Sequence, residues 1–237
     1  MTGVVLDRIA AATLRPDESR QVFRAVLDAL SRPGRIEQLP AERLPATPAA
    51  LLPVLALADL GTGVAVLDDG AAWAEVIGVV TSAPEAPLGT ARFVAATRTP
   101  SPGELREACR GRALAPEEGA LVCFPVPDLD STDLGGTAPG GTGVGSAGIA
   151  GVGGTALAGE KVGVTGVGGT NAVGAEWILS GPGVPGRRAL SGPDGALVAA
   201  RAEAVAGFPA GIDLLLITPD GRMAGIPRTT VIEGKDL

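Results

Sequence analysis

Hydrophobic side chains recur every three to four residues along several stretches of the chain, which is the spacing of one face of an α-helix. The clearest stretch is residues 17–31, where Asp17 can cap the first turn and Pro33-Gly34 ends the helix sharply. Weaker forms of the same pattern predict helices at residues 48–60, 101–111 and 196–207, and a helix or turn segment at 71–84. Helices are therefore expected in both the N-terminal and the C-terminal half of the chain.

Short apolar runs between these helices predict β-strands, at residues 63–69, 91–97, 119–126 and 176–183. The third run is apolar throughout, which is typical of a strand covered on both faces. Near the C-terminus, residues 212–232 give a strand, a Pro-Asp-Gly turn and a second strand, the pattern of a β-hairpin. Strands that alternate with helices predict an α/β fold, here formed by a single domain of residues 1–237 with a C-terminal hairpin.

Composition limits the partners that this domain can have. The net charge is −7 without any basic block, so binding to the phosphates of DNA or RNA is not expected. The N-terminus has no signal-peptide pattern, and no apolar run of about 18 residues could span a bilayer. Cys109 and Cys123 are isolated, as expected of reduced thiols in a cytoplasmic protein. We therefore expect a cytoplasmic protein without nucleic-acid or membrane partners.

The missing residue types narrow the chemistry further. The chain contains no His and no Tyr, so a Ser-His-Asp or Cys-His mechanism is impossible within it. Two distant Cys residues and no His give no spacing typical of a metal site, and none is predicted. Lys161 and Lys235 are the only lysines. No set of catalytic residues is therefore identified from the sequence.

One stretch, residues 135–174, imitates a nucleotide-binding loop. Residues 143–148 match the pattern GxGxxG, but no strand leads into them and the glycines that follow do not support a helix. Residues 154–161 approach a phosphate-binding loop, except that Glu160 stands where that motif needs Lys. The repeated GVGGT and the abundance of Gly instead predict a flexible, low-complexity segment.

The rest of the chain carries a recognisable set of motifs. FRAVLDALSRPG, GRALAPEEGALV, LSGPGV, FPAGIDLLL and GIPRTT follow one another between about residues 17 and 232. Together they resemble the H subunit of the bacterial carbon–phosphorus lyase core complex, the PhnH family; FPAGID and GIPRTT are the most specific. The resemblance implies a short connection before LSGPGV, so the Gly-rich segment is predicted to be an insertion at about residues 131–174.

The resemblance also implies a fold and a role. The fold would be a three-layer α/β arrangement similar to the large domain of pyridoxal-phosphate-dependent transferases, without that cofactor. Neither Lys161 nor Lys235 lies at the end of a core element, where a Schiff-base lysine is needed. The chain would join other core subunits, and form a homodimer when isolated. That complex is understood to exchange the adenine of ATP for a phosphonate at the ribose C1 carbon, giving ribose 1-phosphonate 5-triphosphate. A scaffold or regulatory role is expected, and activity of the chain alone is left open.

Four residues of the last two motifs are candidate ligand-binding groups: Arg228, Thr229, Thr230 and Asp213. Arg228 could hold a phosphate or phosphonate with two parallel hydrogen bonds, and the two Thr hydroxyls could add donors. Alternatively, Arg228 and Asp213 neutralise one another, since Asp213 begins an apolar strand and would be costly to bury alone. An anion- or nucleotide-binding subunit is thus one alternative function, and an oxidoreductase that binds a nucleotide through the Gly-rich stretch is another.

Overall fold

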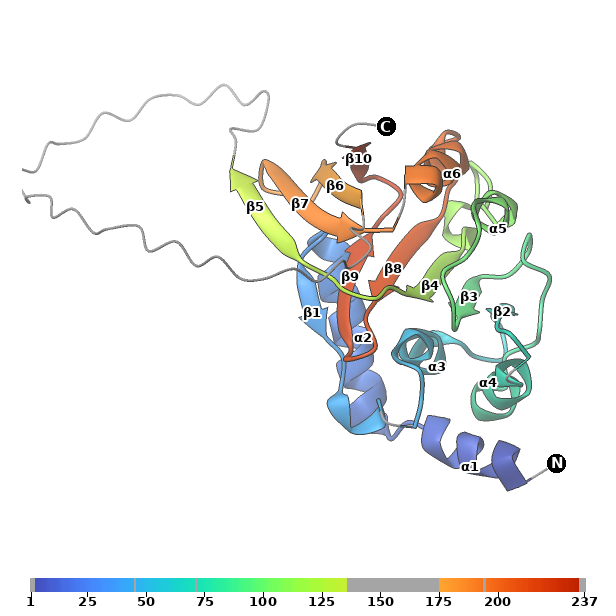
Figure 1. Cartoon of the computed structure of the whole chain (residues 1–237). Coiled ribbons are helices and arrows are strands. Elements are labelled where there is room, and N and C mark those ends of the chain that lie inside the picture. The colour runs from blue at the N-terminus through green and yellow to red at the C-terminus, as the bar shows by residue number, and fades with distance from the viewer. Residues whose placement is uncertain (1–2, 45, 71, 136–174, 194, 235–237) are drawn as a thin grey trace, which may run out of the picture.

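The computed structural model describes residues 3–44, 46–70, 72–135, 175–193 and 195–234, which form two β-sheets and six α-helices. A six-stranded sheet lies at the centre, with one layer of helices on one face and a mixed layer of helices and a second sheet on the other (Figure 1). The predicted α/β class is therefore confirmed. The likeness to pyridoxal-phosphate-dependent transferases stays a prediction.

The central sheet is mostly parallel. Its strands, in spatial order, are β1 (Ile36–Gln38), β9 (Arg222–Ile226), β8 (Asp213–Ile217), β4 (Leu121–Pro125), β3 (Phe93–Ala96) and β2 (Val64–Leu67). Strands β2, β3, β4 and β8 are parallel, whereas β9 and β1 are added in antiparallel fashion. The β8–β9 pair, with Leu214 opposite Ile226, is the predicted C-terminal hairpin.

Alternate side chains of the sheet enter two separate hydrophobic cores. In β4, Leu121 and Cys123 pack on one face, and Val122 and Phe124 on the other. The first core is closed by four α-helices: α1 (Gly3–Ala12), α2 (Pro16–Ser31), α3 (Leu52–Leu57) and α4 (Trp73–Thr81). Burial on both faces explains why β4 is apolar throughout rather than alternating.

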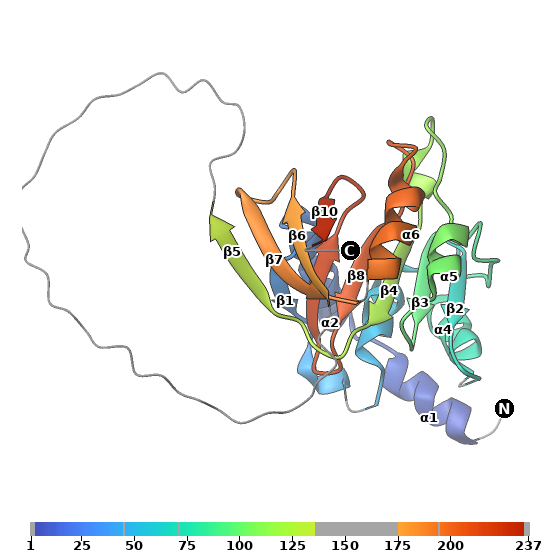
Figure 2. The same ribbon diagram turned by 45° about the horizontal axis from the view of Figure 1, so that its top comes forward.

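The second core lies under a mixed layer whose two helices were predicted, whereas its sheet was not. Helices α5 (Pro102–Glu107) and α6 (Gly195–Val205) share this face with a four-stranded antiparallel sheet (Figure 2). Its strands, in spatial order, are β10 (Val231–Gly234), β6 (Ala175–Ser180), β7 (Arg187–Gly192) and β5 (Ser131–Gly135). Trp177 and Leu190 bury their side chains between the two sheets.

The end of β5 and the start of β6 lie at opposite ends of β7. Both strands are antiparallel to β7 and flank it on either side, so they are parallel to one another. Strand β5 ends at Gly135, opposite Arg187, whereas β6 begins at Ala175, opposite Gly192. The first five residues of the predicted insertion, 131–135, are thus a strand of the fold, and residues 136–174 lie outside the described residues.

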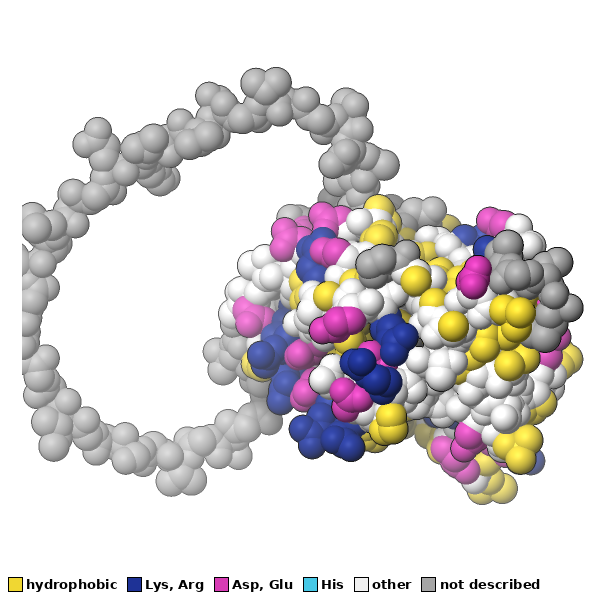
Figure 3. All heavy atoms as spheres, turned by 90° about the horizontal axis from the view of Figure 1, so that it is seen from below, with side chains coloured by type: hydrophobic (Ala, Val, Ile, Leu, Met, Phe, Trp, Pro, Cys, Tyr) yellow, Lys and Arg dark blue, Asp and Glu magenta, His cyan; other side chains and the backbone are white. Residues whose placement is uncertain are grey.

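The face formed by the first helical layer carries both signs of charge. Arg side chains intermix with Asp and Glu on one side of this face, and hydrophobic side chains gather on the other (Figure 3). Among the described residues, no helix is long and apolar enough to cross a membrane.

Candidate functional site

The motifs that identify the chain come together in two clusters. In the first, the end of α2 docks against the turn that follows β6 and against the start of the last motif. The amide of Gly34 donates to the carbonyl of Gly225 at 3.0 Å. A Cβ atom on Gly225 would lie 2.6 Å from the backbone of Ala29, and one on Gly183 would overlap the carbonyl of Ser31. These glycines therefore permit a close approach of helix and sheet.

The second cluster is built around Asp213 and Arg228. Asp213 is the first residue of β8, and Arg228 follows β9 at the same end of the hairpin. The Arg228 guanidinium donates from Nη2 to Oδ2 at 2.6 Å and from Nε to Oδ1 at 3.2 Å, and its backbone amide donates to Oδ1 at 2.7 Å. The two side chains are only 13% and 19% exposed. The predicted pairing of these residues is confirmed.

Arg228 also fixes the loop that carries the GRALAPEEGALV motif. Its Nη1 donates to the carbonyl of Pro116 at 2.6 Å and to that of Pro209 at 3.4 Å. The amide of Gly211 donates to the carbonyl of Arg110 at 2.7 Å, which ties the FPAGID segment to the same loop. Three motifs are thus joined by a single side chain and one backbone bond, although the first lies about a hundred residues before the other two.

The two threonines of the last motif have different positions. Thr229 is exposed on the turn before β10. Thr230 is buried, and among the described residues its Oγ1 has no hydrogen-bond partner. The fold therefore brings Arg228 and Asp213 together. The three proposed anion donors differ in exposure, and the Arg228 guanidinium is already bonded within the protein. Anion binding by Arg228, Thr229 and Thr230 stays a prediction.

Two further arginines lie near Asp213 and were not identified from the sequence. Arg201, on α6, is 3% exposed and donates from Nη2 to the carbonyls of Pro227 and Thr230 at 2.7 and 3.0 Å. Burial lowers its pKa to about 10, and Asp213 partly offsets this. The sequence signal was weak: Arg201 interrupts an otherwise apolar helix face.

Arg92 is the second of these arginines and directly precedes β3. Its Nη1 donates to the carbonyl of Gly119 at 2.6 Å, and burial lowers its pKa while Asp213 raises it. The Cζ atom of its guanidinium also lies 5.3 Å from the centre of the Phe93 ring. An arginine just before a buried strand is common on surfaces, so its position alone gave no indication of a site.

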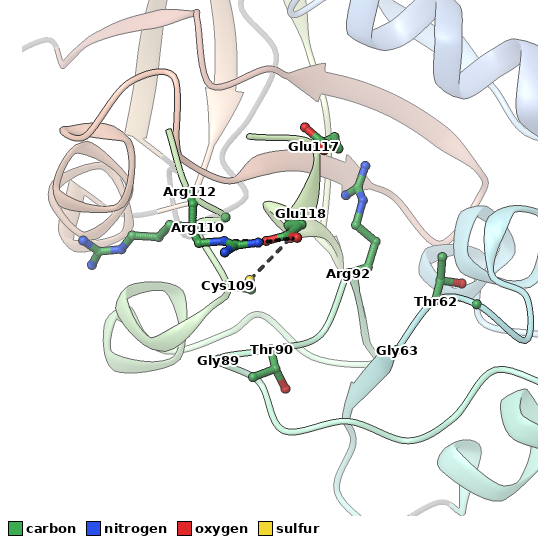
Figure 4. Close-up of a pocket in the computed structure, with 12 residues that line it drawn as sticks. Thr62, Gly63, Gly89, Thr90, Arg92, Cys109, Arg110, Arg112, Glu117 and Glu118 are labelled. Atoms are coloured by element: carbon green, nitrogen blue, oxygen red, sulfur yellow. Dashed lines mark hydrogen bonds and ion pairs between the residues drawn. The ribbon is translucent and has the colours of Figure 1, made fainter. Parts of the chain in front are cut away.

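A hollow of about 570 Å³ opens beside Arg92 (Figure 4). It lies at the amino ends of β2, β3 and β4, between the turns at residues 61–63, 89–92 and 109–112, and Glu117 and Glu118 stand at its rim. Arg112 pairs with Glu118 through Nη2 and Oε1 at 2.9 Å. A hollow of this size can hold a small-molecule ligand.

Comparison with protein families gives a match over residues 11–156 and 162–233 to the family described as Bacterial phosphonate metabolism protein (PhnH). This chain belongs to the PhnH family. The break in the match falls within the Gly-rich stretch, and the longer insertion stays a prediction. None of the curated proteins compared with the chain matches it.

In this PhnH-family protein the hollow at the usual ligand end of the parallel sheet is lined by uncharged side chains. Ligands of open α/β sheets commonly bind at the carboxyl ends of the strands. Here that end has a hollow of about 230 Å³, and among the described residues its lining contains no charged side chain. Thr218, which lines it, already donates to the Asp220 carboxylate. The charged hollow lies at the opposite end of the strands.

The two cysteines of this PhnH-family chain have different surroundings, since Cys123 is buried and Cys109 lines the hollow. Burial raises the pKa of the Cys123 thiol far above its usual range, which disfavours the reactive thiolate. Cys109 donates its thiol to the carbonyl of Glu118 at 3.4 Å. Within the described ranges, no three His, Cys, Asp or Glu side chains lie close enough to hold a metal ion. Lys161 and Lys235 lie outside the described residues.

Proposed function

We propose that this PhnH-family protein is a scaffold subunit of the carbon–phosphorus lyase core complex, in which it supports transfer of a phosphonate to the ribose C1 of ATP with release of adenine. Family membership makes it a protein of phosphonate metabolism. The observation that carries the scaffold role is the use of the family motifs: Arg228, Asp213 and the motif glycines bond or pack within the fold. ATP and phosphonate would be substrates of the complex, and this chain would bind no cofactor.

Helix α2 offers a surface for such assembly. Its outward side presents Phe23 and Leu27, which are 44% and 52% exposed and lie one helical turn apart. Exposed apolar side chains that adjoin one another mark interaction surfaces more often than isolated ones do. We propose that this pair contributes to the homodimer or to the contact with another core subunit.

Reconstitution of the complex with and without this chain tests the scaffold role. We expect the tagged chain to co-purify with the other core subunits, and adenine release from ATP to require the assembled complex. The chain alone should release no adenine. Adenine release by the purified chain would overturn the non-catalytic part of the proposal, and failure to co-purify would overturn membership of the complex.

A double variant of the α2 surface tests the interface. Phe23→Ser with Leu27→Ser should weaken self-association or subunit capture by at least about tenfold, because apolar anchors carry most of the binding energy of an interface. Sedimentation of the isolated chain would show a shift from twice 23.4 kDa toward 23.4 kDa if the pair holds the homodimer. Leu114→Ser, at a side chain that is 99% exposed, is the matched control and should change neither measurement.

The alternative proposal, anion binding through Arg228, Thr229 and Thr230, needs Arg228 to release part of its internal contacts. Calorimetric titration of ATP or methylphosphonate against the wild type and Arg228→Lys tests it, since Lys keeps the charge but cannot form the parallel pair of bonds. The oxidoreductase alternative depends on residues 143–148, which lie outside the described residues. If deletion of residues 136–174 abolished a nucleotide-dependent activity, that result would support the oxidoreductase alternative.

A further inference from the structure

The interior next to the hollow holds more positive than negative charge. Three arginines interact with the Asp213 carboxylate. Arg92 and Arg201 interact with it electrostatically, whereas Arg228 is paired with it directly. Among the described residues, no carboxylate lies within ion-pair distance of Arg92 or Arg201; both donate to backbone carbonyls instead. Guanidinium groups stay protonated in proteins, so this region has three cations and one anion.

Arg92 is the member of this group that reaches the hollow. It lines the cavity wall, whereas Arg201 and Arg228 do not. In Figure 4 its side chain rises from the start of β3 between the turn at residues 61–63 and the loop that carries Glu117. A partly desolvated charge without a counter-ion is costly, and an anion in the hollow would compensate it.

We propose that this hollow is an oxyanion site, the Arg92 pocket, which binds a phosphate or phosphonate group through the guanidinium of Arg92. A guanidinium matches two oxygens of a tetrahedral oxyanion with parallel hydrogen bonds, which an ammonium cannot do. The volume of about 570 Å³ leaves room for a substituent on the phosphorus atom. The site is separate from the proposed scaffold role and does not depend on it.

The fold holds the walls of this pocket in place. The loop of residues 109–119 is fixed from behind by the bonds from Arg228 to Pro116 and from Gly211 to Arg110. On the rim, Arg112 is neutralised by Glu118, and Glu117 is exposed. Glu117 would repel a bound anion. Its replacement by a neutral residue should therefore raise the affinity for the anion, whereas loss of Arg92 should lower it. A wall that is fixed before binding lowers the entropic cost of holding a ligand.

Isothermal titration of the full chain with pyrophosphate, methylphosphonate and ATP tests the site. We expect one equivalent of at least one of these probes to bind. Arg92→Gln should bind it at least about tenfold more weakly, since a charge-assisted hydrogen bond is lost. Glu117→Gln should bind it more tightly. Arg24→Gln removes the same charge from the exposed face of α2 and should leave the affinity unchanged. The probe that binds best identifies the source of the oxyanion.

A footprint on the wild type covers the case in which Arg92→Gln does not fold, because Arg92 also supports the Gly119 carbonyl. Phenylglyoxal modifies exposed arginines, and mass spectrometry locates the adducts. The bound probe should slow modification of Arg92 and leave that of Arg24 unchanged. Absence of binding and of protection at about 10 mM of every probe overturns the site, and so does equal weakening by Arg24→Gln. Subunit capture measures the scaffold proposal separately, so the two failures are distinguishable.

Discussion

A carboxylate at the first position of a buried strand needs a permanent partner. Asp213 begins β8 with a side chain that is mostly covered, and Arg228, just after β9, donates three hydrogen bonds to it. The arrangement satisfies both oxygens of the carboxylate and also aims the free end of the guanidinium at the Pro116 carbonyl. One residue thus neutralises a charge and connects two motifs.

Removal of the guanidinium should leave an uncompensated charge. We expect Arg228→Ala to lower the free energy of unfolding by about 3 kcal/mol, the size of loss seen when one partner of a covered ion pair is deleted. Urea denaturation measures this. Arg24→Ala, on the exposed side of α2, should change stability by less than about 0.5 kcal/mol. In the double variant with Asp213→Ala, part of the loss should be recovered, and purely additive losses would contradict the pairing.

Glu18 gives a pH-dependent contribution near the start of α2. Arg43 donates to it from Nη2 at 2.6 Å and from Nε at 2.9 Å, and the amide of Arg15 adds a third bond. These bonds lower the pKa of Glu18 from 4.5 to about 2 in the folded state. The ionised form is therefore favoured by folding, so its stabilisation is complete above about pH 4.5 and is lost as the pH falls toward 2.

The comparison of wild type with Glu18→Gln isolates this effect from other carboxyl groups. Urea denaturation at pH 7, 5, 4 and 3 should show a stability difference that is constant above about pH 5 and narrows below it. Glu75→Gln, at an exposed position of α4, is the control and should show no such narrowing. A difference that widens in acid would contradict the assignment.

At the scale of elements, the contact between α2 and β9 depends on one missing side chain. A Cβ atom on Gly225 would meet the backbone of Ala29, which cannot move without shifting the helix. We expect Gly225→Ala to cost about 1–3 kcal/mol of stability. Gly207→Ala meets no atom within 4 Å and should be neutral or slightly stabilising. Thermal unfolding of the two variants should separate them clearly, and similar melting temperatures would argue against the close approach.

The sequence predicted those elements whose periodicity or apolar length is strong. Helix α2 and strand β4 lie close to their predicted bounds. The C-terminal hairpin also forms as predicted but ends at Ile226, and residues 231–232 belong instead to β10 of the second sheet. The second sheet was missed because its strands β5 and β7 are rich in Gly, Ser and charged residues, and a half-exposed strand of that composition resembles a loop.

The candidate site could likewise be predicted only in part. The Asp213–Arg228 pair was predictable, because a charge beside an apolar run demands an explanation. Arg92 and Arg201 lie far from it in the sequence, and only the packing of β3 and α6 brings them near. Such a cluster arises from tertiary contacts, and no local pattern of residue types contains it.

For the molecule as a whole, shortening the segment between β5 and β6 tests the arrangement of the second sheet. Replacing residues 136–174 by about 14 Gly and Ser residues should keep the fold, because parallel strands need a crossover of roughly a dozen residues. Replacement by two residues should detach β5 or β6. The emission of Trp177 in a Trp73→Phe background reports this, since Trp177 is buried between the sheets. Identical spectra for both deletions would contradict the strand order.

The same strand order fixes the distance that any domain inserted between β5 and β6 has to span. Five residues along β7 and two strand separations place Gly135 and Ala175 about 20 Å apart, at opposite corners of the small sheet. A foreign domain whose own termini are much closer together would pull these corners toward each other unless linkers of several residues were added. A reporter protein grafted here with such linkers should leave both sheets assembled, which makes the β5–β6 junction a place to tag the protein without using either terminus.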